Sequence, residues 1–355
     1  MAANPWDMTA TIKQSPPVDV SQPYDASTMD NKTILVTGGA NGLGSHMVRA
    51  WASRGANIII GDVDDRAGEA LVADLRSLYP SRAFAHVHCD VTSWDDQTRL
   101  FEAAVRSSPS STVDIVVPNA GIIQASDSFA FENPRPPRDG GKLPKPSTKT
   151  IDVNVTGVIY TTHLALSHFS SSPNAARDKR DRCLLLVGSV ASIYPLAGQA
   201  HYTMSKHAVC GLFRSLRMTA PLHHRGVRVN MLAPYFVERS RMLPKAADIA
   251  FLAGTAGGAT VADVVDAATR LVADESISGR CLAVGPRLRH APPGELPVAP
   301  HEGAGQGRAA WEVYAHDYEE VDAFTRRYIR CMNAVTQLRG VLGWLVDVCR
   351  KLLGS

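Results

Sequence analysis

The sequence lacks several features that would place the protein in other functional classes. None of its apolar runs approaches the roughly 20 residues that a membrane-spanning helix needs. Its formal net charge is only +3, which is too small an excess to indicate binding to nucleic acid. No positively charged segment followed by an apolar core opens the chain, so we expect no secretory signal. Internal repeats are also absent.

Cysteine is scarce and scattered. The six cysteines form no Cys-x-x-Cys pair and no zinc-finger spacing, which predicts reduced packing thiols and a cytoplasmic protein. They are Cys89, Cys183, Cys210, Cys281, Cys331 and Cys349. His86 and His88 alternate along a predicted strand, but no third ligand is near them, so we interpret them as a strand face and predict no metal site.

The sequence does contain a regular alternation of strand and helix patterns. Its 45% hydrophobic and 20% charged residues are typical of a globular protein. The alternation over residues 31–286 predicts an α/β fold with a doubly wound parallel sheet of about seven strands. Residues 1–30 are rich in proline and predict a strap or a disordered arm. Residues 287–310 predict a linker, and 311–355 a helical C-terminal extension.

Three interpretations of the helical extension stay open. Its apolar faces could dock on the protein's own core or substrate loop, contact a second copy or lie on a membrane surface, and the first of these is favoured. The irregular segment 130–147 also has two interpretations. It is basic and rich in proline and glycine, so it is either a lid over the substrate or a surface insertion.

A glycine-rich turn marks a candidate nucleotide site. Residues 33–44 read TILVTGGANGLG, in which an apolar β-branched run predicts a buried parallel strand. The glycines Gly38, Gly42 and Gly44 follow, and an apolar-periodic helix begins at Leu43. Such a turn between strand and helix lets a pyrophosphate approach the backbone at a helix N-terminus.

Asp62 decides the expected cofactor. It ends the second predicted strand, at the position where a carboxylate would accept hydrogen bonds from a ribose and repel a 2′-phosphate. Asn41 stands in the glycine turn where NADP binding would favour a basic residue. Both residues predict NAD, although NADP stays open.

Ser189, Tyr202 and Lys206 form a candidate proton-transfer group. Lys206 follows Tyr202 by one helical turn, so both side chains share a face. The ordinary pKa of tyrosine is about 10, and a nearby ammonium lowers it by favouring the phenolate. A serine hydroxyl beside the phenol can hold the oxygen of a substrate. Alone, a Tyr-x-x-x-Lys pair is more often a chance spacing on a helix surface. It indicates a catalytic pair here because a candidate nucleotide site precedes it in the chain.

Together these segments resemble the short-chain dehydrogenase/reductase family, over roughly residues 32 to 286. The sequences of several segments look most like those of fungal family members tied to secondary metabolism. The matching motifs are Thr37-Gly38-x-x-x-Gly42-x-Gly44, Cys89-Asp90-Val91, Asn119-Ala120-Gly121, Asn154, Ser189, Tyr202 and Lys206.

The resemblance implies a Rossmann-type fold and a role for each matching residue. Tyr202 would exchange the proton, Ser189 would orient the substrate oxygen, and Lys206 would lower the tyrosine pKa and hold the nicotinamide ribose. Asn154 would support a water relay to the lysine. Besides Tyr202 and Lys206, the implied cofactor contacts are Thr37, Gly38, Asn41, Gly42, Leu43, Gly44, Asp62, Asp90, Val91, Asn119, Ala120 and Val237.

The chain also departs from the family pattern. Pro118 replaces an asparagine before Asn119 and has no N–H to donate, so bonding at that strand end must differ. Tyr235 replaces the glycine that normally follows Pro234, and Arg239 and Ser240 stand near the usual threonine site. Backbone contacts from Phe236 and Val237 could then hold the carboxamide.

The resemblance implies an oxidoreductase that interconverts a secondary alcohol and a ketone on a hydrophobic small molecule, with NAD-linked oxidation favoured. The apolar residues of the predicted substrate loop, 239–259, also indicate a hydrophobic substrate. An NADPH-dependent ketoreductase is the alternative. A nucleotide-sensing protein without catalysis is a remote one, because such proteins typically lose the tyrosine or the lysine. The substrate and the oligomeric state stay open.

Overall fold

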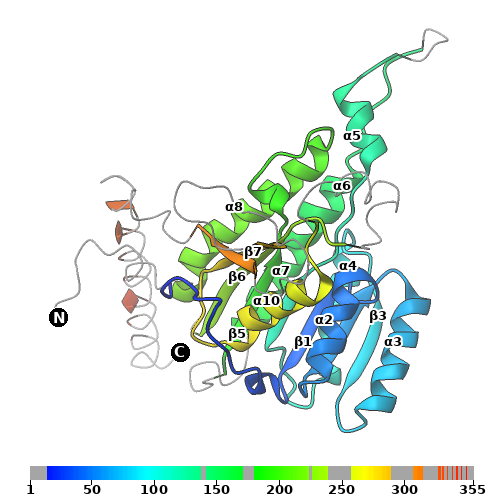
Figure 1. The fold of residues 1–355 in the computed structure, drawn as a ribbon. Helices are drawn as coiled ribbons and strands as arrows, with labels where there is room; N and C mark the ends of the chain where they lie inside the picture. Colours follow the sequence, from blue (N-terminus) through cyan, green and yellow to red (C-terminus); the bar gives the residue numbers. More distant parts are fainter. Residues whose placement is uncertain are drawn as a thin grey trace.

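The computed structural model describes residues 14–136, 141–170, 180–223, 226–238, 257–288 and 307–314, and separate helical positions between Arg327 and Cys349 (Figure 1). An eight-stranded sheet in the order β3-β2-β1-β4-β5-β6-β7-β8 forms its centre. Strands β1 to β7 run parallel, and β8 is antiparallel to β7. The predicted Rossmann-type α/β fold is therefore confirmed.

The strands are short apolar runs, as a sheet covered on both faces requires. Every residue of β1, β4, β5 and β6 is buried. The strand bounds are β1 Thr33–Thr37, β2 Asn57–Asp62, β3 Phe84–His88, β4 Ile115–Pro118, β5 Arg182–Val187, β6 Val227–Pro234, β7 Cys281–Leu288 and β8 Arg308–Val313.

Helices cover both faces of the sheet (Figure 1). One face carries α2 (Gly42–Ala52), α3 (Asp65–Leu78) and α10 (Val261–Ala273). The other carries α4 (Trp94–Ser107), α7 (Gly157–Ser170) and α8 (Ala200–His223).

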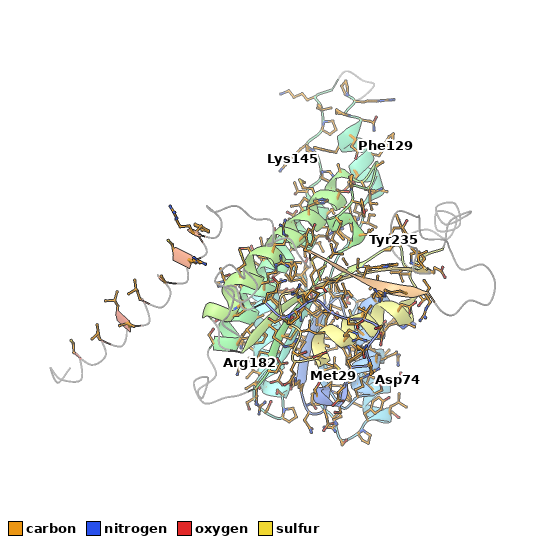
Figure 2. The ribbon with its side chains drawn as sticks, turned by 60° about the vertical axis from the view of Figure 1, so that its left-hand side comes forward. Met29, Asp74, Phe129, Lys145, Arg182 and Tyr235 are labelled. Carbon is orange, nitrogen blue, oxygen red and sulfur yellow. The ribbon has the colours of Figure 1, made fainter. Side chains whose placement is uncertain are left out.

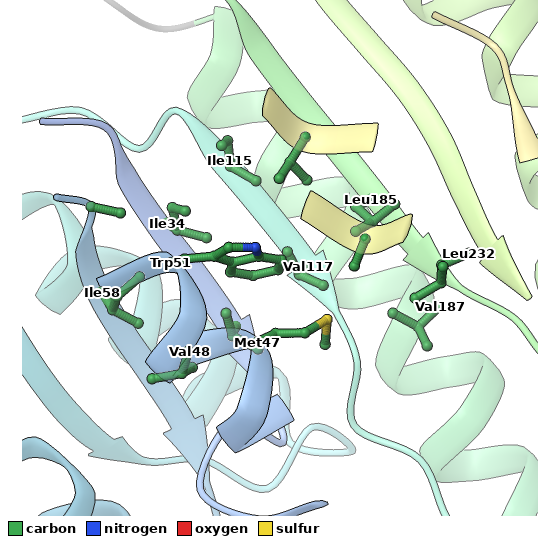
Figure 3. Close-up of a cluster of buried hydrophobic side chains, with 14 of the residues drawn as sticks. Ile34, Met47, Val48, Trp51, Ile58, Ile115, Val117, Leu185, Val187 and Leu232 are labelled. Atoms are coloured by element: carbon green, nitrogen blue, oxygen red, sulfur yellow. The ribbon is translucent and has the colours of Figure 1, made fainter. Parts of the chain in front are cut away.

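Trp51 anchors the first of these layers. It lies among Ile34, Met47 and Val117 (Figure 3). Its indole nitrogen donates to Thr269 Oγ1 at 3.0 Å, so the one polar atom of this buried ring has a partner. This contact joins α2 to α10 and fixes the helix that starts at the glycine turn.

The short helices lie mostly at the carboxyl end of the sheet. They are η1 (Ser27–Met29), α5 (Ala125–Glu132), α6 (Lys149–Ile151), the π-helical turn η2 (Asp152–Thr156) and the 3₁₀ turn η3 (Val190–Ser192). Residues 125–136 and 141–148 form an arm that projects from the sheet, and Phe129 and Lys145 lie on it (Figures 1 and 2). Part of the segment expected to be irregular is helical, because α5 extends to Glu132.

The described part of the N-terminal segment lies along α10. Tyr24 donates its hydroxyl to Asp266 Oδ1 at 2.8 Å, and the Arg270 guanidinium lies 4.5 Å from the centre of the tyrosine ring. Thr28 Oγ1 donates to the Ala273 carbonyl at 2.7 Å. Residues 14–30 thus have the form of a strap, whereas Trp6 lies outside the described residues.

The C-terminal part differs from expectation. The segment from Trp311 was expected to be helical, but Arg308–Val313 form strand β8, so that boundary is wrong and the sheet has eight strands. The aromatic spacing fits a helix locally. The open edge of β7, however, offers N–H and C=O groups that an extended segment can satisfy. Positions between Arg327 and Cys349 are helical, and Leu338, Leu342 and Leu345 among them are exposed.

A buried arginine joins both ends of the chain to the sheet. Arg280 precedes β7, is 1% exposed, and its Nη1 lies 3.1 Å from Glu312 Oε1 on β8. The same guanidinium donates to the Ser15 carbonyl of the strap. Glu312 also accepts a hydrogen bond from the Val18 N–H. The strap and β8 are therefore held by one ion pair.

Two classes of site are not found within the described ranges. No helix there is long and apolar enough to cross a membrane. No group of three metal-binding side chains occurs in the same residues. His88 contacts Asp65 instead, with Nδ1 3.0 Å from Oδ1, and the Nε2 atom of His86 lies 3.9 Å from the same oxygen.

Candidate active site

The glycine turn between β1 and α2 leaves room for a ligand. Gly42 has φ +52°, and a Cβ added there would meet no atom within 4 Å. Gly44 is the opposite case, because an added Cβ would lie 2.2 Å from the Gly38 carbonyl oxygen. One glycine therefore gives an open approach to the backbone, and the other allows the helix to pack closely against the turn.

The start of α2 suits an anion. Asn41 is the N-cap residue but makes no side-chain cap. Its amide instead donates to Asp64 Oδ2 at 2.8 Å. The first N–H groups of a helix lack partners within the helix and favour negative charge. The turn thus fits the pyrophosphate of a dinucleotide.

Asp62 lies next to this turn at the end of β2. Its Oδ2 accepts from the Ala40 N–H at 3.0 Å, and its Oδ1 accepts from the Asp64 N–H at 3.0 Å. The two bonds fix the carboxylate at the edge of the nucleotide site. Each oxygen has a second lone pair, so the carboxylate can also accept from ribose hydroxyls.

The turn after β4 packs directly on the glycine turn. Asn119 Nδ2 donates to the carbonyls of Thr37 and Gly38, at 3.0 and 2.8 Å. Thr37 Oγ1 accepts from the N–H groups of Asn119 and Ala120, at 3.1 and 3.3 Å. These bonds hold the strand end although Pro118 has no N–H to donate.

The predicted adenine contacts lie at the end of β3. Asp90 Oδ1 accepts from the Thr92 N–H and hydroxyl, at 2.9 and 2.8 Å, and Val91 is buried beside it. Burial raises the pKa of the Cys89 thiol to about 12, which keeps this cysteine protonated. The adenine role of Asp90 and Val91 stays a prediction.

Ser189 follows β5 and begins η3. Its Oγ accepts from the Ala191 N–H at 3.1 Å and donates to the Pro234 carbonyl at 3.4 Å. The Ser189 N–H donates back to Ser192 Oγ at 3.2 Å, which completes a capping box. This local pattern fixes the serine at the carboxyl end of the sheet.

Tyr202 and Lys206 lie in the first turns of α8, as the spacing predicts. The ammonium is 5.7 Å from the centre of the tyrosine ring, and the side chains are 8% and 5% exposed. Burial raises the pKa of Tyr202, while a hydrogen bond with Ser189 lowers it. Burial also lowers the pKa of Lys206 to about 8. Lys206 Nζ donates to the Val187 carbonyl at 3.0 Å.

Asn154 lies in the π-helical turn η2 and is fully buried. Its Oδ1 accepts from the Ile122 N–H at 2.8 Å, and its Nδ2 donates to the Ile122 carbonyl at 2.9 Å. Nδ2 also donates to Ser205 Oγ at 3.0 Å. Asn154 therefore ties the turn after β4 to α8. Its expected role in a water relay stays a prediction.

Comparison with known proteins decides the family. The model of the short chain dehydrogenase family matches residues 32–248. The chain is 36% identical over 274 residues to 5'-hydroxyaverantin dehydrogenase of Dothistroma septosporum, covering 74% of this chain and 87% of that protein. This chain is a short-chain dehydrogenase.

Other relatives agree. The protein of the same name from Emericella nidulans is 34% identical over 76% of this chain and 88% of its own length. NADP-dependent dehydrogenase M3 of a Phoma species is 31% identical over 73% and 76%. A solved 3-ketoacyl-(acyl-carrier-protein) reductase from Brucella melitensis, complexed with NADH, has a TM-score of 0.58 at 24% identity, over 72% of this chain and 98% of that one. That structure supports the fold alone.

The short-chain dehydrogenase is therefore an oxidoreductase that interconverts an alcohol and a carbonyl group with NAD or NADP. The predicted residues around Ser189, Tyr202 and Lys206 lie together. Val237 forms an isolated bridge with Ala259 and is 9% exposed, and its contact with the cofactor stays a prediction. The predicted substrate loop, including Arg239 and Ser240, lies mostly outside the described residues.

The sequence analysis missed three side chains that support the dehydrogenase site. Ser192 Oγ donates to the Lys206 carbonyl at 2.8 Å, and Ser205 Oγ donates to the Tyr202 carbonyl at 2.8 Å. Glu132 on the arm accepts from the Ala200 N–H at 2.9 Å, at the start of α8. The serine-x-x-serine spacing from Ser189 was a usable signal for Ser192. No local pattern indicates the contact of Glu132.

Proposed function

We propose that this dehydrogenase oxidises a secondary alcohol on a hydrophobic small molecule to the ketone, with NAD⁺ as the acceptor. The observation that carries the proposal is the position of Tyr202 and the buried Lys206 in the first turns of α8, with the ammonium 5.7 Å from the centre of the tyrosine ring and Ser189 close enough to influence its pKa. NAD⁺, when bound, accepts the hydride from the carbinol carbon. The alcohol proton passes to the Tyr202 phenolate while Ser189 holds the substrate oxygen, and the product is the ketone.

The ionisation of Tyr202 depends on its neighbours. Its burial disfavours the phenolate, so the residue needs a compensating charge to act as a base at neutral pH. The Lys206 ammonium supplies this charge in the same low-dielectric environment. Lys206 would also hold the nicotinamide ribose, and Asn154 would support the water relay. Both of these roles are part of the proposal.

We favour NAD because two carboxylates border the place of the adenosine ribose. Asp62 is fixed by two backbone N–H groups. Asp64 accepts a hydrogen bond from the side-chain amide of Asn41, which therefore does not cap the helix. Negative charge at this edge repels a 2′-phosphate. The alternative is an NADPH-dependent ketoreductase, and the relative named NADP-dependent dehydrogenase M3 favours it.

The substrate is proposed from the relatives and from the residues near the site. Two relatives are named 5'-hydroxyaverantin dehydrogenase, which supports an alcohol of secondary metabolism with a polyketide-like skeleton. Exposed Phe129 and Tyr194 near the carboxyl end of the sheet favour an apolar molecule. A cytoplasmic location is also proposed, on the strength of four buried free cysteines.

Calorimetric titration with NAD⁺ and NADP⁺, side by side, tests the cofactor. Tight binding of NAD⁺ alone supports Asp62 as the ribose ligand, and the reverse order supports the ketoreductase. A panel of secondary alcohols with the preferred cofactor then tests the reaction, followed by the absorbance of the reduced nicotinamide. Binding of neither cofactor would contradict the proposal, as would turnover at the wild-type rate in Tyr202→Phe.

A further inference from the structure

Trp311 lies on the catalytic face of the sheet, although it belongs to β8. Its register partner on β7 is Ala283, which packs on the face that carries α7 and α8. Val313, two residues further along β8, packs in the same layer. Side chains two residues apart on a strand share a face, so Trp311 also points to the side of α8.

The indole of Trp311 reaches the carboxyl end of β7. A Cβ added to Gly285 would lie 3.0 Å from Cζ3 and 3.5 Å from Cη2 of this ring. The same added Cβ would lie 3.9 Å from the Cβ of Tyr235. The indole of Trp311 and the Cβ of Tyr235 therefore both border the space that Gly285 leaves open.

Tyr235 extends this aromatic surface toward the catalytic serine. Its ring makes an edge contact with Phe236, at 5.1 Å between centres and 86° between planes. Tyr235 is 37% exposed and directly follows Pro234, whose carbonyl accepts from Ser189 Oγ. We call Tyr235, Phe236 and Trp311 the aromatic wall. Its first residue, Tyr235, is next in the chain to Pro234, which contacts Ser189.

We propose that the aromatic wall packs against a flat aromatic ring of the substrate, and that Trp311 determines specificity for it. This proposal rests on the proposed function, because it concerns the alcohol that Ser189 and Tyr202 act on. Aromatic pairs have directional contacts that saturated rings cannot make, so the wall selects flat rings over puckered ones. Trp311 and Phe236 are partly exposed and Tyr235 is exposed, which leaves ring surface for such a contact.

The bland alternative is that Trp311 only closes the edge of the sheet. Removing the ring would then disturb β7 and lower activity toward every alcohol alike. A specificity role predicts unequal losses. The two roles are separated by a pair of alcohols with one carbon skeleton, namely 1-tetralol, which has an aromatic ring, and 1-decalol, which is saturated.

The experiment compares kcat/KM for the two alcohols in wild type, Trp311→Leu and Trp311→Phe. Loss of an aromatic pair predicts a fall of about five- to tenfold for 1-tetralol in Trp311→Leu. We expect less than about twofold for 1-decalol, and Trp311→Phe should keep most of the preference. Trp94→Leu is the matched control, because Trp94 is an exposed tryptophan on α4 that contacts Tyr160. Equal losses for both alcohols, or no loss, would overturn the proposal.

Two further measurements keep the test independent of folding and of turnover. If Trp311→Leu does not fold, Gly285→Ala replaces it, since the new methyl group presses on the indole, must shift it slightly and should lower the same ratio. If the wild type oxidises neither alcohol, the ratio has no readout, and the alcohol panel and cofactor titration decide the proposed function separately. Calorimetry of 2-naphthol binding to the wild type and Trp311→Phe, each with cofactor, then decides the wall. Equal affinity in both proteins would overturn it.

Discussion

The nucleotide half and the substrate half of this sheet are assembled in different ways. In the nucleotide half, Gly38, Asp62 and Asn119 lie at the ends of strands, and their contacts run between adjacent turns. In the substrate half, the start of α8 contacts the arm through Glu132, and β7 pairs with the added antiparallel strand β8. Both halves join segments that are distant in the chain, since Asn119 and Gly38 are 81 residues apart and Glu132 and Ala200 are 68 apart. The first half uses only turns at the ends of adjacent strands, while the second depends on a projecting arm and an added antiparallel strand.

This difference explains where a change should act. The strand-end turns of the nucleotide half would hold the cofactor through their own backbone, so substitutions in the substrate half should leave cofactor binding intact. Long-range supports act on the position of Tyr202, so their loss should alter turnover more than affinity. Four substitutions test whether the two halves are separable in this way.

The largest expected effect is that of Tyr202→Phe. Removing the hydroxyl that exchanges the proton should lower kcat by about 10²- to 10⁴-fold. Calorimetry should show unchanged affinity for the cofactor, because the ring and its packing remain. A variant that lost both turnover and cofactor affinity would show that the halves are coupled at this residue.

Lys206→Met should remove the destabilisation that a buried charged lysine causes below its folded pKa. The folded pKa of about 8 lies below the ordinary 10.5, so the folded cofactor-free protein binds fewer protons than the unfolded chain between these values. The free energy of unfolding contributed by Lys206 therefore rises with pH across this window and is lowest below it. Urea unfolding at about pH 7 and about pH 10 should show a rise of roughly 3 kcal/mol in wild type relative to the variant. The same rise in both would contradict the burial of a charged lysine.

Asp62→Asn tests the nucleotide half alone. Loss of charge-assisted hydrogen bonds to the ribose should weaken NAD⁺ binding about tenfold or more and improve the relative affinity for NADP⁺. At saturating cofactor, kcat should stay close to wild type. Asp65→Asn is the control, since that carboxylate lies in the next helix and contacts His88 instead. A large fall in kcat for Asp62→Asn would show that this residue affects turnover as well as cofactor binding, so that the two halves are not separable.

Glu132→Ala has the smallest expected effect and tests the long-range support. The first turn of α8 would lose a partner for the Ala200 N–H, at a cost of about 1 kcal/mol for a typical helix cap. We expect kcat to fall about fivefold with KM and cofactor affinity unchanged. Glu132→Gln keeps an acceptor oxygen and should restore the rate. A change in KM without a change in kcat would instead assign the arm to substrate binding.

The same contrast accounts for what could be predicted from the sequence. Strands β1 to β7, the glycine turn and the pair Tyr202 and Lys206 follow from spacing along a few residues, and their positions agree with the structure. Trp311 was assigned to a helix because local spacing does not reveal that β7 has an open edge. The support from Glu132 was missed because its partner lies 68 residues away. Pairings of this kind depend on the folded arrangement of the chain.

The ion pair of Arg280 and Glu312 limits how the chain can be shortened. The family model matches residues 32–248, so the strap and β8 both lie outside it. A chain that begins at β1 would lack the strap, and a chain that ends after β7 would lack β8. Each cut takes a partner from a guanidinium that is 1% exposed, and a buried charge without its partners is strongly destabilising. The strap and β8 are thus structural parts of the enzyme, and fusions or truncations have to preserve residues 14–18 and 308–313.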